Sequence, residues 1–254
     1  FINKIKAGEL FMLIDYFGFP FDNKIVRKLK ENGAYLIHDC SQALFFDCRN
    51  SLADFILFSP RKFLGVPDGG ILMNKTDLGF TPPNLSSPPQ DVFLSLFSAV
   101  LQRREFDIWD GKREWYDLFR QAENKFSPAP YAMSELSTLL FKNAFDYEQI
   151  KLQRRTNFMV LVKGLAKLAL FPELPEDIVP LGFPIVLDQR DQVQQRLFEK
   201  NIYPPIHWEI KNAVPIDFVE SHKLSKRILT LPCDQRYEKC DMDYLVESIV
   251  EIID

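Results

Sequence analysis

The chain has 254 residues, 46% of them hydrophobic, which is enough to bury a core in one large domain or in one and a half. Its formal net charge is −4 and its Lys and Arg residues are scattered, so the basic face of a nucleic-acid-binding protein is not evident. No apolar run reaches membrane-spanning length. Four cysteines without a CxxC pair, in a chain whose three histidines lie far apart in the sequence, favour reduced thiols in a cytoplasmic protein over a disulfide framework or a zinc site.

The first part of the chain alternates short apolar runs with one amphipathic segment. Asp22 is suited to cap a helix at its start, and Gly33 is suited to end it. Strand, helix and strand joined by short connections are typical of an α/β fold with a mostly parallel sheet and flanking helices. The predicted strands are LFMLIDYFG (10–18), YLIHDC (35–40), ADFILFS (53–59) and GGILMNK (69–75), and the predicted helix covers 22–33.

A proline-rich loop, TPPNLSSPPQD (81–91), separates this part from helical sequence. After Phe171 the long helical segments give way to short predicted strands and helices, which indicates a smaller αβ domain at the end of the chain. We therefore interpret 1–145 as part of a large cofactor-binding domain and 146–254 as a connecting helix with a small C-terminal domain. The remaining predicted helices are 91–106, 111–126, two within 133–168, 190–201 and 240–254, and the remaining strands are 179–187 and 228–232.

Three polar side chains follow two neighbouring predicted strands. Asp39 ends one strand, Gln42 lies in the turn after it, and Lys62 follows the next strand, before a glycine-rich turn. Ligands of open α/β sheets bind at the carboxyl ends of the strands. Pyridoxal 5′-phosphate needs an amine for its aldehyde, an acid that keeps its pyridine nitrogen protonated and a donor for its phenolic oxygen. The pattern therefore predicts a pyridoxal-phosphate site.

Each of these residues also has a plainer interpretation. Lys62 alone would be interpreted as an exposed turn lysine, and Asp39 and Gln42 as residues that cap turns. Ser59 in SPRK is a candidate cofactor contact, against the alternative that its hydroxyl satisfies backbone groups ahead of Pro60.

Longer segments carry a resemblance to a known family. LIDYFGFPFD, LIHDCSQAL and ADFILFSPRKFLGVPDGGIL are similar to the DegT/DnrJ-type sugar aminotransferases, which belong to the fold type I pyridoxal-phosphate enzymes. YAMSELSTLLFKNAFDYEQIKLQRRTNF resembles a helix start and a paired-arginine helix of that family, and YPPIHW and LTLPCDQRYEKCDMDYLVESIVEII resemble its C-terminal end. The resemblance covers nearly the whole chain, in order.

The resemblance implies an aminotransferase that acts on a keto sugar, commonly attached to a nucleotide, with an amino acid such as glutamate as donor. It implies Lys62 as the catalytic lysine, Asp39 as the partner of the pyridine nitrogen, Gln42 near the phenolic oxygen, and a homodimer. Family members usually carry a serine at the position of Leu57 and a phosphate-binding loop nearer the N-terminus. Because the chain begins FINKIKAGEL and has no such loop, we expect an N-terminal part to be missing.

Two other functions stay open at this stage. A non-catalytic dimeric relative would keep the fold as a regulatory or interaction module, and residues such as Leu57 would then stand where relatives bind the cofactor phosphate. Another fold type I chemistry, such as a desulfurase or a lyase, would share Lys62 and Asp39.

Overall fold

The computed structural model describes residues 5–76, 78–79, 81–109 and 111–253. The chain divides into two compact units, Phe1–Asp146 and Tyr147–Asp254. Each unit has its own sheet and its own helices. Within the described residues, no helix combines the length and the apolar character that crossing a membrane requires.

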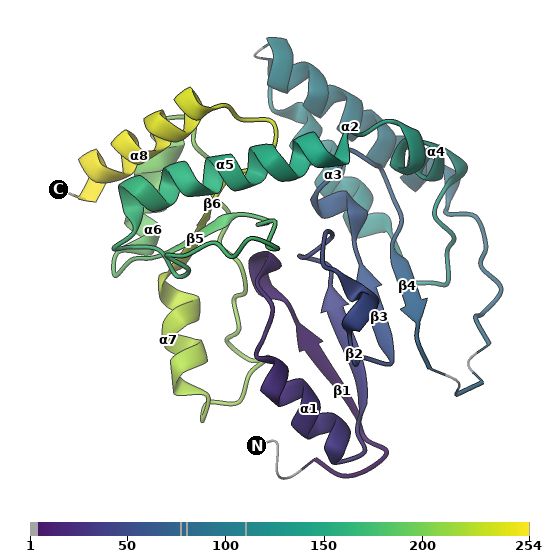
Figure 1. Ribbon diagram of the computed structural model, residues 1–254. Helices are drawn as coiled ribbons and strands as arrows, with labels where there is room; N and C mark the ends of the chain where they lie inside the picture. Colours follow the sequence, from purple (N-terminus) through teal and green to yellow (C-terminus); the bar gives the residue numbers. More distant parts are fainter. Residues whose placement is uncertain (1–4, 77, 80, 110, 254) are drawn as a thin grey trace. The chain divides into compact units, whose positions relative to one another are not determined.

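The first unit is built on a four-stranded sheet (Figure 1). Its strands are β1 (Leu10–Ile14), β2 (Tyr35–Cys40), β3 (Phe55–Phe58) and β4 (Ile71–Asn74), in the spatial order β1-β2-β3-β4. The first three strands are parallel, and β4 runs antiparallel to β3. The prediction of an α/β fold with a mostly parallel sheet is thus confirmed.

Helix α1 (Asn23–Glu31) connects β1 to β2 and covers one face of the sheet. Its start is capped as predicted, because the Asp22 side chain accepts the backbone N–H of Lys24 at 2.8 Å. The helix ends ahead of Gly33, whose φ of +78° lies in the left-handed region that favours glycine. Its apolar residues Val26 and Leu29 join the buried core between the helix and the sheet.

The opposite face of the sheet is mostly apolar, and it is most exposed on the outer strands β1 and β4. Leu10, Met12 and Leu72 are 60%, 48% and 49% exposed. Leu72 pairs with Leu57, which pairs in turn with Asp39, so these three side chains share one face of the sheet. We call the face that carries these residues the open sheet face.

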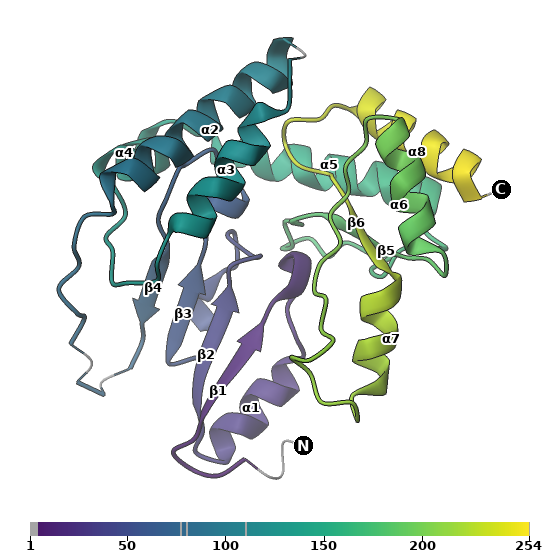
Figure 2. The same cartoon turned by 180° about the vertical axis from the view of Figure 1, so that it is seen from behind.

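Helices follow the sheet in the first unit, after the loop that was predicted for 81–91. Helices α2 (Gln90–Trp109) and α3 (Glu114–Lys125) form a pair (Figure 2) whose shared core contains Val92, Leu96 and Ala122. Helix α4 (Glu135–Asn143) begins at Ser134, whose hydroxyl accepts the backbone N–H of Ser137 at 3.1 Å. The predicted helices of this region are confirmed.

The second unit packs helices around the antiparallel strands β5 (Phe183–Val186) and β6 (Ile228–Leu231). Its long helix is α5 (Tyr147–Leu165), which contacts α8 where Gly164 leaves no room for a side chain against Val246. The other helices are α6 (Arg190–Glu199), α7 (Val219–Arg227) and α8 (Lys239–Ile253). Of these, α7 was not predicted from the sequence.

The paired arginines of α5, Arg154 and Arg155, donate to backbone carbonyls of a segment that lies 20 to 27 residues further along the chain. Arg154 is only 2% exposed and donates to the carbonyls of Pro180 and Leu181, each at 3.1 Å, and to the Gln235 side chain at 2.7 Å. Burial lowers the pKa of this guanidinium. Arg154 is therefore a buried hydrogen-bond hub, which satisfies backbone carbonyls that irregular segments leave unpaired.

Candidate active site

The candidate site lies where β2 and β3 end. Asp39 is on β2, and its backbone carbonyl accepts the N–H of Asp15 at 3.1 Å, at the end of the β1–β2 pairing. Its carboxylate accepts the backbone N–H of Ser41 at 2.8 Å and also the Ser41 hydroxyl. These bonds fix one carboxylate oxygen, so the Asp39 side chain has a defined orientation at the carboxyl edge of the sheet.

Lys62 follows β3 at the end of a short 3-10 helix, Pro60–Lys62. Its side chain keeps solvent access, yet burial lowers the pKa of its amine, and the Asp39 carboxylate opposes that effect in part. The two residues lie at the same edge of the sheet, because β2 and β3 are neighbouring parallel strands. The neighbouring Arg61 turns elsewhere: it binds Glu123 of α3 at 2.7 Å and lies over the Phe119 ring.

Gln42 is buried, with 6% of its surface exposed, and its amide has a defined orientation. The side-chain oxygen accepts the backbone N–H of Phe17 at 2.9 Å. That bond identifies the oxygen end of the amide, so the other end is the NH₂ group. The NH₂ group donates to no residue that the structure describes. Gln42 is therefore more than a turn cap, and it keeps a hydrogen-bond donor for a ligand.

Ser59 is half-buried beside the same loop. Its backbone carbonyl accepts the N–H of Lys62 at 3.2 Å, but its hydroxyl makes no capping bond to the following turn. The simple expectation that this hydroxyl satisfies backbone groups is therefore not met among the described residues. Contact between Ser59 and a cofactor stays a prediction.

Sequence reasoning missed Tyr16. It lies in the 3-10 helix Tyr16–Gly18 directly after β1, where Phe17 adopts a left-handed φ of 60°. The phenol is 42% exposed, and its pKa is raised by burial and by the Asp39 carboxylate. Tyr16 thus adds an aromatic hydroxyl to the site. The signal for it in the sequence was weak: Tyr16 is an aromatic residue that follows an apolar run and stands two residues ahead of Gly18.

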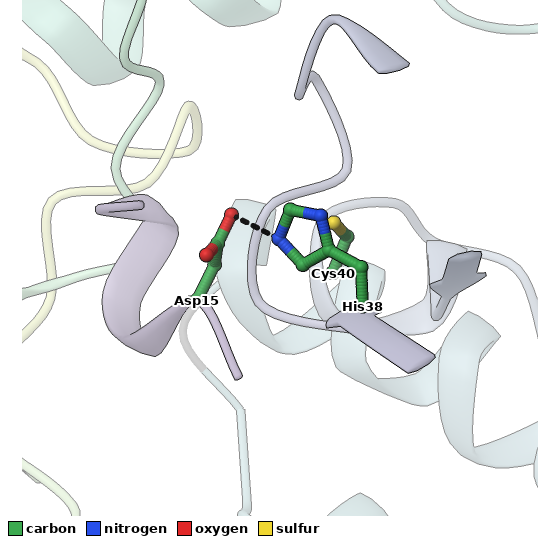
Figure 3. A group of neighbouring side chains, drawn as sticks. All are labelled: Asp15, His38 and Cys40. Atoms are coloured by element: carbon green, nitrogen blue, oxygen red, sulfur yellow. Dashed lines mark ion pairs between the residues drawn. The ribbon is translucent and has the colours of Figure 1, made fainter. Parts of the chain in front are cut away.

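A second polar group, Asp15, His38 and Cys40, lies on the other side of β2 (Figure 3). All three are buried, and their potential metal-ligating atoms lie within 4.8 Å of one another. Asp15 Oδ2 is 2.9 Å from His38 Nε2, whereas the Cys40 sulfur lies across the imidazole ring from that carboxylate (Figure 3). No sequence pattern indicated this group, because Asp15 and His38 are brought together only by the register of β1 and β2.

The Asp15–His38 pair has a structural role, because it lies among aromatic side chains in the interior of the first unit. The His38 ring packs between Phe21 and Phe46, with centroid distances of 4.8 and 4.6 Å. Burial raises the pKa of the Cys40 thiol, so it stays protonated as a small core residue. The pair therefore ties β1 to β2 just behind Asp39.

The residues at the strand ends fit the requirements of pyridoxal phosphate. An amine with a lowered pKa, a fixed carboxylate and an amide with a free donor meet at one edge. Among the described residues near them, no phosphate cradle is evident: Leu57 pairs with Asp39 on the same face and offers no donor from its side chain.

The fold has clear counterparts among solved structures. A DegT/DnrJ/EryC1/StrS aminotransferase from Brucella abortus matches with a TM-score of 0.58 over 94% of this chain, at 17% identity. The sugar aminotransferase CalS13 from Micromonospora echinospora gives 0.60 over 98%, at 14% identity. PseC of Helicobacter pylori, an aminotransferase involved in the biosynthesis of pseudoaminic acid, gives 0.64 over 95%, at 15% identity.

At these identities the likeness establishes the fold: the chain has the α/β fold of the sugar aminotransferases, as the fold type I resemblance implied. It spans 63% of the Brucella protein, 69% of CalS13 and 66% of PseC. No protein-family model and no curated protein sequence matches the chain.

Proposed function

We propose that the chain forms most of a pyridoxal-phosphate-dependent aminotransferase of the DegT/DnrJ type, acting on a sugar. The observation that carries the proposal is that Asp39 and Lys62 lie at the carboxyl ends of β2 and β3, which are neighbouring parallel strands. The fold shared with sugar aminotransferases supports it, because a lysine and an acid at this edge are what that chemistry uses.

The roles follow from the chemistry of each side chain. The cofactor, when bound, supplies an aldehyde for the substrate amine and a ring that accepts electrons. Lys62 supplies an amine as nucleophile and as a base that moves a proton on the substrate carbon, and the burial that lowers its pKa favours the unprotonated form. With the cofactor bound, Asp39 would hold a proton at the ring nitrogen, and the Gln42 NH₂, which is left over once the amide oxygen accepts the Phe17 N–H, would be the donor for the phenolic oxygen.

The finer assignment rests on the resemblance. We propose a keto sugar linked to a nucleotide as amino acceptor and an amino acid such as glutamate as donor. We also propose that the active form is a homodimer and that it is located in the cytoplasm. Ser59 is the proposed additional contact to the cofactor. The carbonyl requirement follows from the reaction class itself, since amino transfer needs a carbonyl on the acceptor.

The cofactor assignment is tested by absorbance. The purified protein, mixed with pyridoxal phosphate and gel-filtered, should retain a visible absorption band, and Lys62→Ala should lose it. Lys28→Ala is the matched control, because Lys28 is an exposed lysine on α1 of the same unit. An equal band in Lys62→Ala and wild type would rule out the role of Lys62.

The amino-transfer assignment needs a second measurement. Adding glutamate to the coloured protein should shift the band as the amino group moves to the cofactor, with 2-oxoglutarate released in equal amount. Colour with no transfer to any amino acid tested would favour the non-catalytic alternative, which the apolar Leu57 side chain beside Asp39 makes worth keeping. Release of sulfur from added cysteine, or of an eliminated group from another added amino acid, would instead indicate desulfurase or lyase chemistry.

A further inference from the structure

The loop that follows Lys62, residues 63–70, is far more buried than a turn between strands requires. Phe63, Leu64 and Val66 are 2%, 4% and 3% exposed. The backbone N–H groups of Phe63 and Leu64 both donate to the Pro60 carbonyl at 2.9 Å, and the Phe63 ring packs edge-to-face on Phe45. The near end of the loop is thus rigidly joined to the turn that bears Lys62.

The far end of the loop is held by Asp68, a carboxylate that is only 5% exposed. Its Oδ2 accepts the backbone N–H of Ser134 at 2.8 Å, and its Oδ1 accepts the Ser134 hydroxyl at 2.6 Å. The Ser137 hydroxyl also donates to Oδ1, and the Asp68 N–H donates back to that hydroxyl at 3.3 Å. A buried charge with this many donors is fully paired, as a buried carboxylate must be to persist.

The attachment point is the first turn of α4. Ser134 caps that helix, so the Asp68 carboxylate sits where the unpaired N–H groups and the helix dipole favour a negative charge. The next residue, Gly69, has a φ of 104°, and a Cβ there would lie 2.4 to 3.0 Å from atoms of the Met133 side chain. Two successive residues of the loop, Asp68 and Gly69, therefore contact the start of α4.

Only five residues separate Lys62 from Asp68. Because Phe63, Leu64 and Val66 among them are buried, the loop has little room to change its conformation. We propose that Asp68 is a positioning residue for Lys62: by clamping the loop to the start of α4, it holds the Lys62 amine at the sheet edge near Asp39. The inference deepens the proposed function and rests on it for the meaning of Lys62, but the position of the amine can be measured without any cofactor. Loss of the clamp frees the loop and lets the amine move away from the sheet edge.

The charge environment of the amine makes this movement measurable. Asp39 is the charged group that acts on Lys62, since Arg61 is turned toward Glu123 on α3. The lowered pKa of Lys62 comes chiefly from burial by its surroundings. An amine released into solvent regains the ordinary lysine pKa and becomes less reactive toward electrophiles at mildly alkaline pH.

The test labels the cofactor-free protein with trinitrobenzenesulfonate across pH and counts the modified Lys62 peptide by mass spectrometry. In Asp68→Asn, labelling of Lys62 at mildly alkaline pH should fall severalfold, because an amine freed from the surroundings that lower its pKa is more fully protonated at that pH. Ser137→Ala, which removes one donor to the same carboxylate, should give a smaller fall in the same direction and serves if Asp68→Asn does not fold.

Asp54→Asn is the matched control. Asp54 lies in the same unit and is also held by hydrogen bonds, from the Lys30 amine at 2.7 Å and the Leu36 N–H at 2.7 Å, but it precedes β3 at the other end of the strands. It should lose stability and leave Lys62 labelling unchanged. An unchanged Lys62 profile in folded Asp68→Asn or Ser137→Ala, or an equal change in Asp54→Asn, overturns the inference.

The cofactor gives an independent readout. If the protein binds pyridoxal phosphate, Asp68→Asn should keep the visible band but shift its pH midpoint, whereas Asp54→Asn should keep the wild-type midpoint. If no variant binds cofactor, the proposed function fails while the labelling result still decides the role of Asp68.

Discussion

The Asp39 carboxylate acts on the Lys62 amine in a direction opposite to burial. Burial lowers the pKa of the amine, and Asp39 raises it, with burial the larger of the two effects. The same carboxylate raises the pKa of the Tyr16 phenol, so one acid on β2 faces two titratable groups from two other segments. Removing its charge should therefore move both groups, and the two effects have predictable signs.

Asp39→Asn should lower the pKa of Lys62 further, because the protonated amine loses its attractive neighbour. Lys62 should then be labelled by trinitrobenzenesulfonate faster than in wild type at mildly alkaline pH, and the Tyr16 phenol should ionise at a lower pH. Amino transfer should nevertheless be lost, because the ring nitrogen loses its partner. Slower labelling of Lys62 in this variant would contradict the coupling, and Lys28 in the same digests reports the behaviour of an exposed lysine.

The hydrogen bond from Phe17 to Gln42 should be worth a measurable part of the stability. Gln42→Met removes the acceptor of a buried backbone N–H, which costs about 1–3 kcal/mol of unfolding free energy. Urea unfolding of the cofactor-free protein measures this loss. Gln121→Met is the control, since Gln121 is exposed on α3 and its replacement should change stability by no more than about 0.5 kcal/mol. Equal midpoints for the two variants would refute the role of the bond.

Much of the fold could be predicted from local pattern. Apolar runs mark β1 to β4, and Asp22 and Gly33 bracket α1 as their backbone preferences dictate. Asp39 and Lys62 were predictable together because each follows an apolar strand, and parallel strands present their carboxyl ends at one edge. Helix α7 escaped prediction because its sequence, VESHKLSKR, offers few apolar residues to set a helical period.

The contacts that could not be predicted join residues distant in sequence. Asp68 bonds Ser134 across 66 residues, and neither residue type indicates its partner. Asp15 meets His38 only through the register of two strands. Charged residues rarely lie inside a protein, and the burial of Arg154 depends on carbonyls that an irregular segment leaves free.

Arg154 should accordingly be a stability residue of the second unit. Arg154→Met leaves three acceptors without their donor, and we expect a loss of about 2–3 kcal/mol of unfolding free energy, in the range for hydrogen bonds to charged groups. Lysine should not rescue it, because an ammonium cannot reproduce the planar set of donors. Lys163→Ala, at an exposed position of the same helix, is the control for urea unfolding. A fully stable Arg154→Lys would show that charge alone suffices.

The open sheet face should bind an apolar dye. A sheet that is largely parallel is normally covered on both faces, yet Leu10 and Leu72, on β1 and β4, remain 60% and 49% exposed. Replacing both with lysine should reduce the fluorescence of bound anilinonaphthalene sulfonate and change the unfolding free energy by no more than about 0.5 kcal/mol for each site. Leu152→Lys, at a 60% exposed position on α5, should leave the dye signal near that of wild type. An equal drop in Leu152→Lys would mean that the dye binds scattered surface residues, so the control decides whether the open sheet face is a continuous apolar surface.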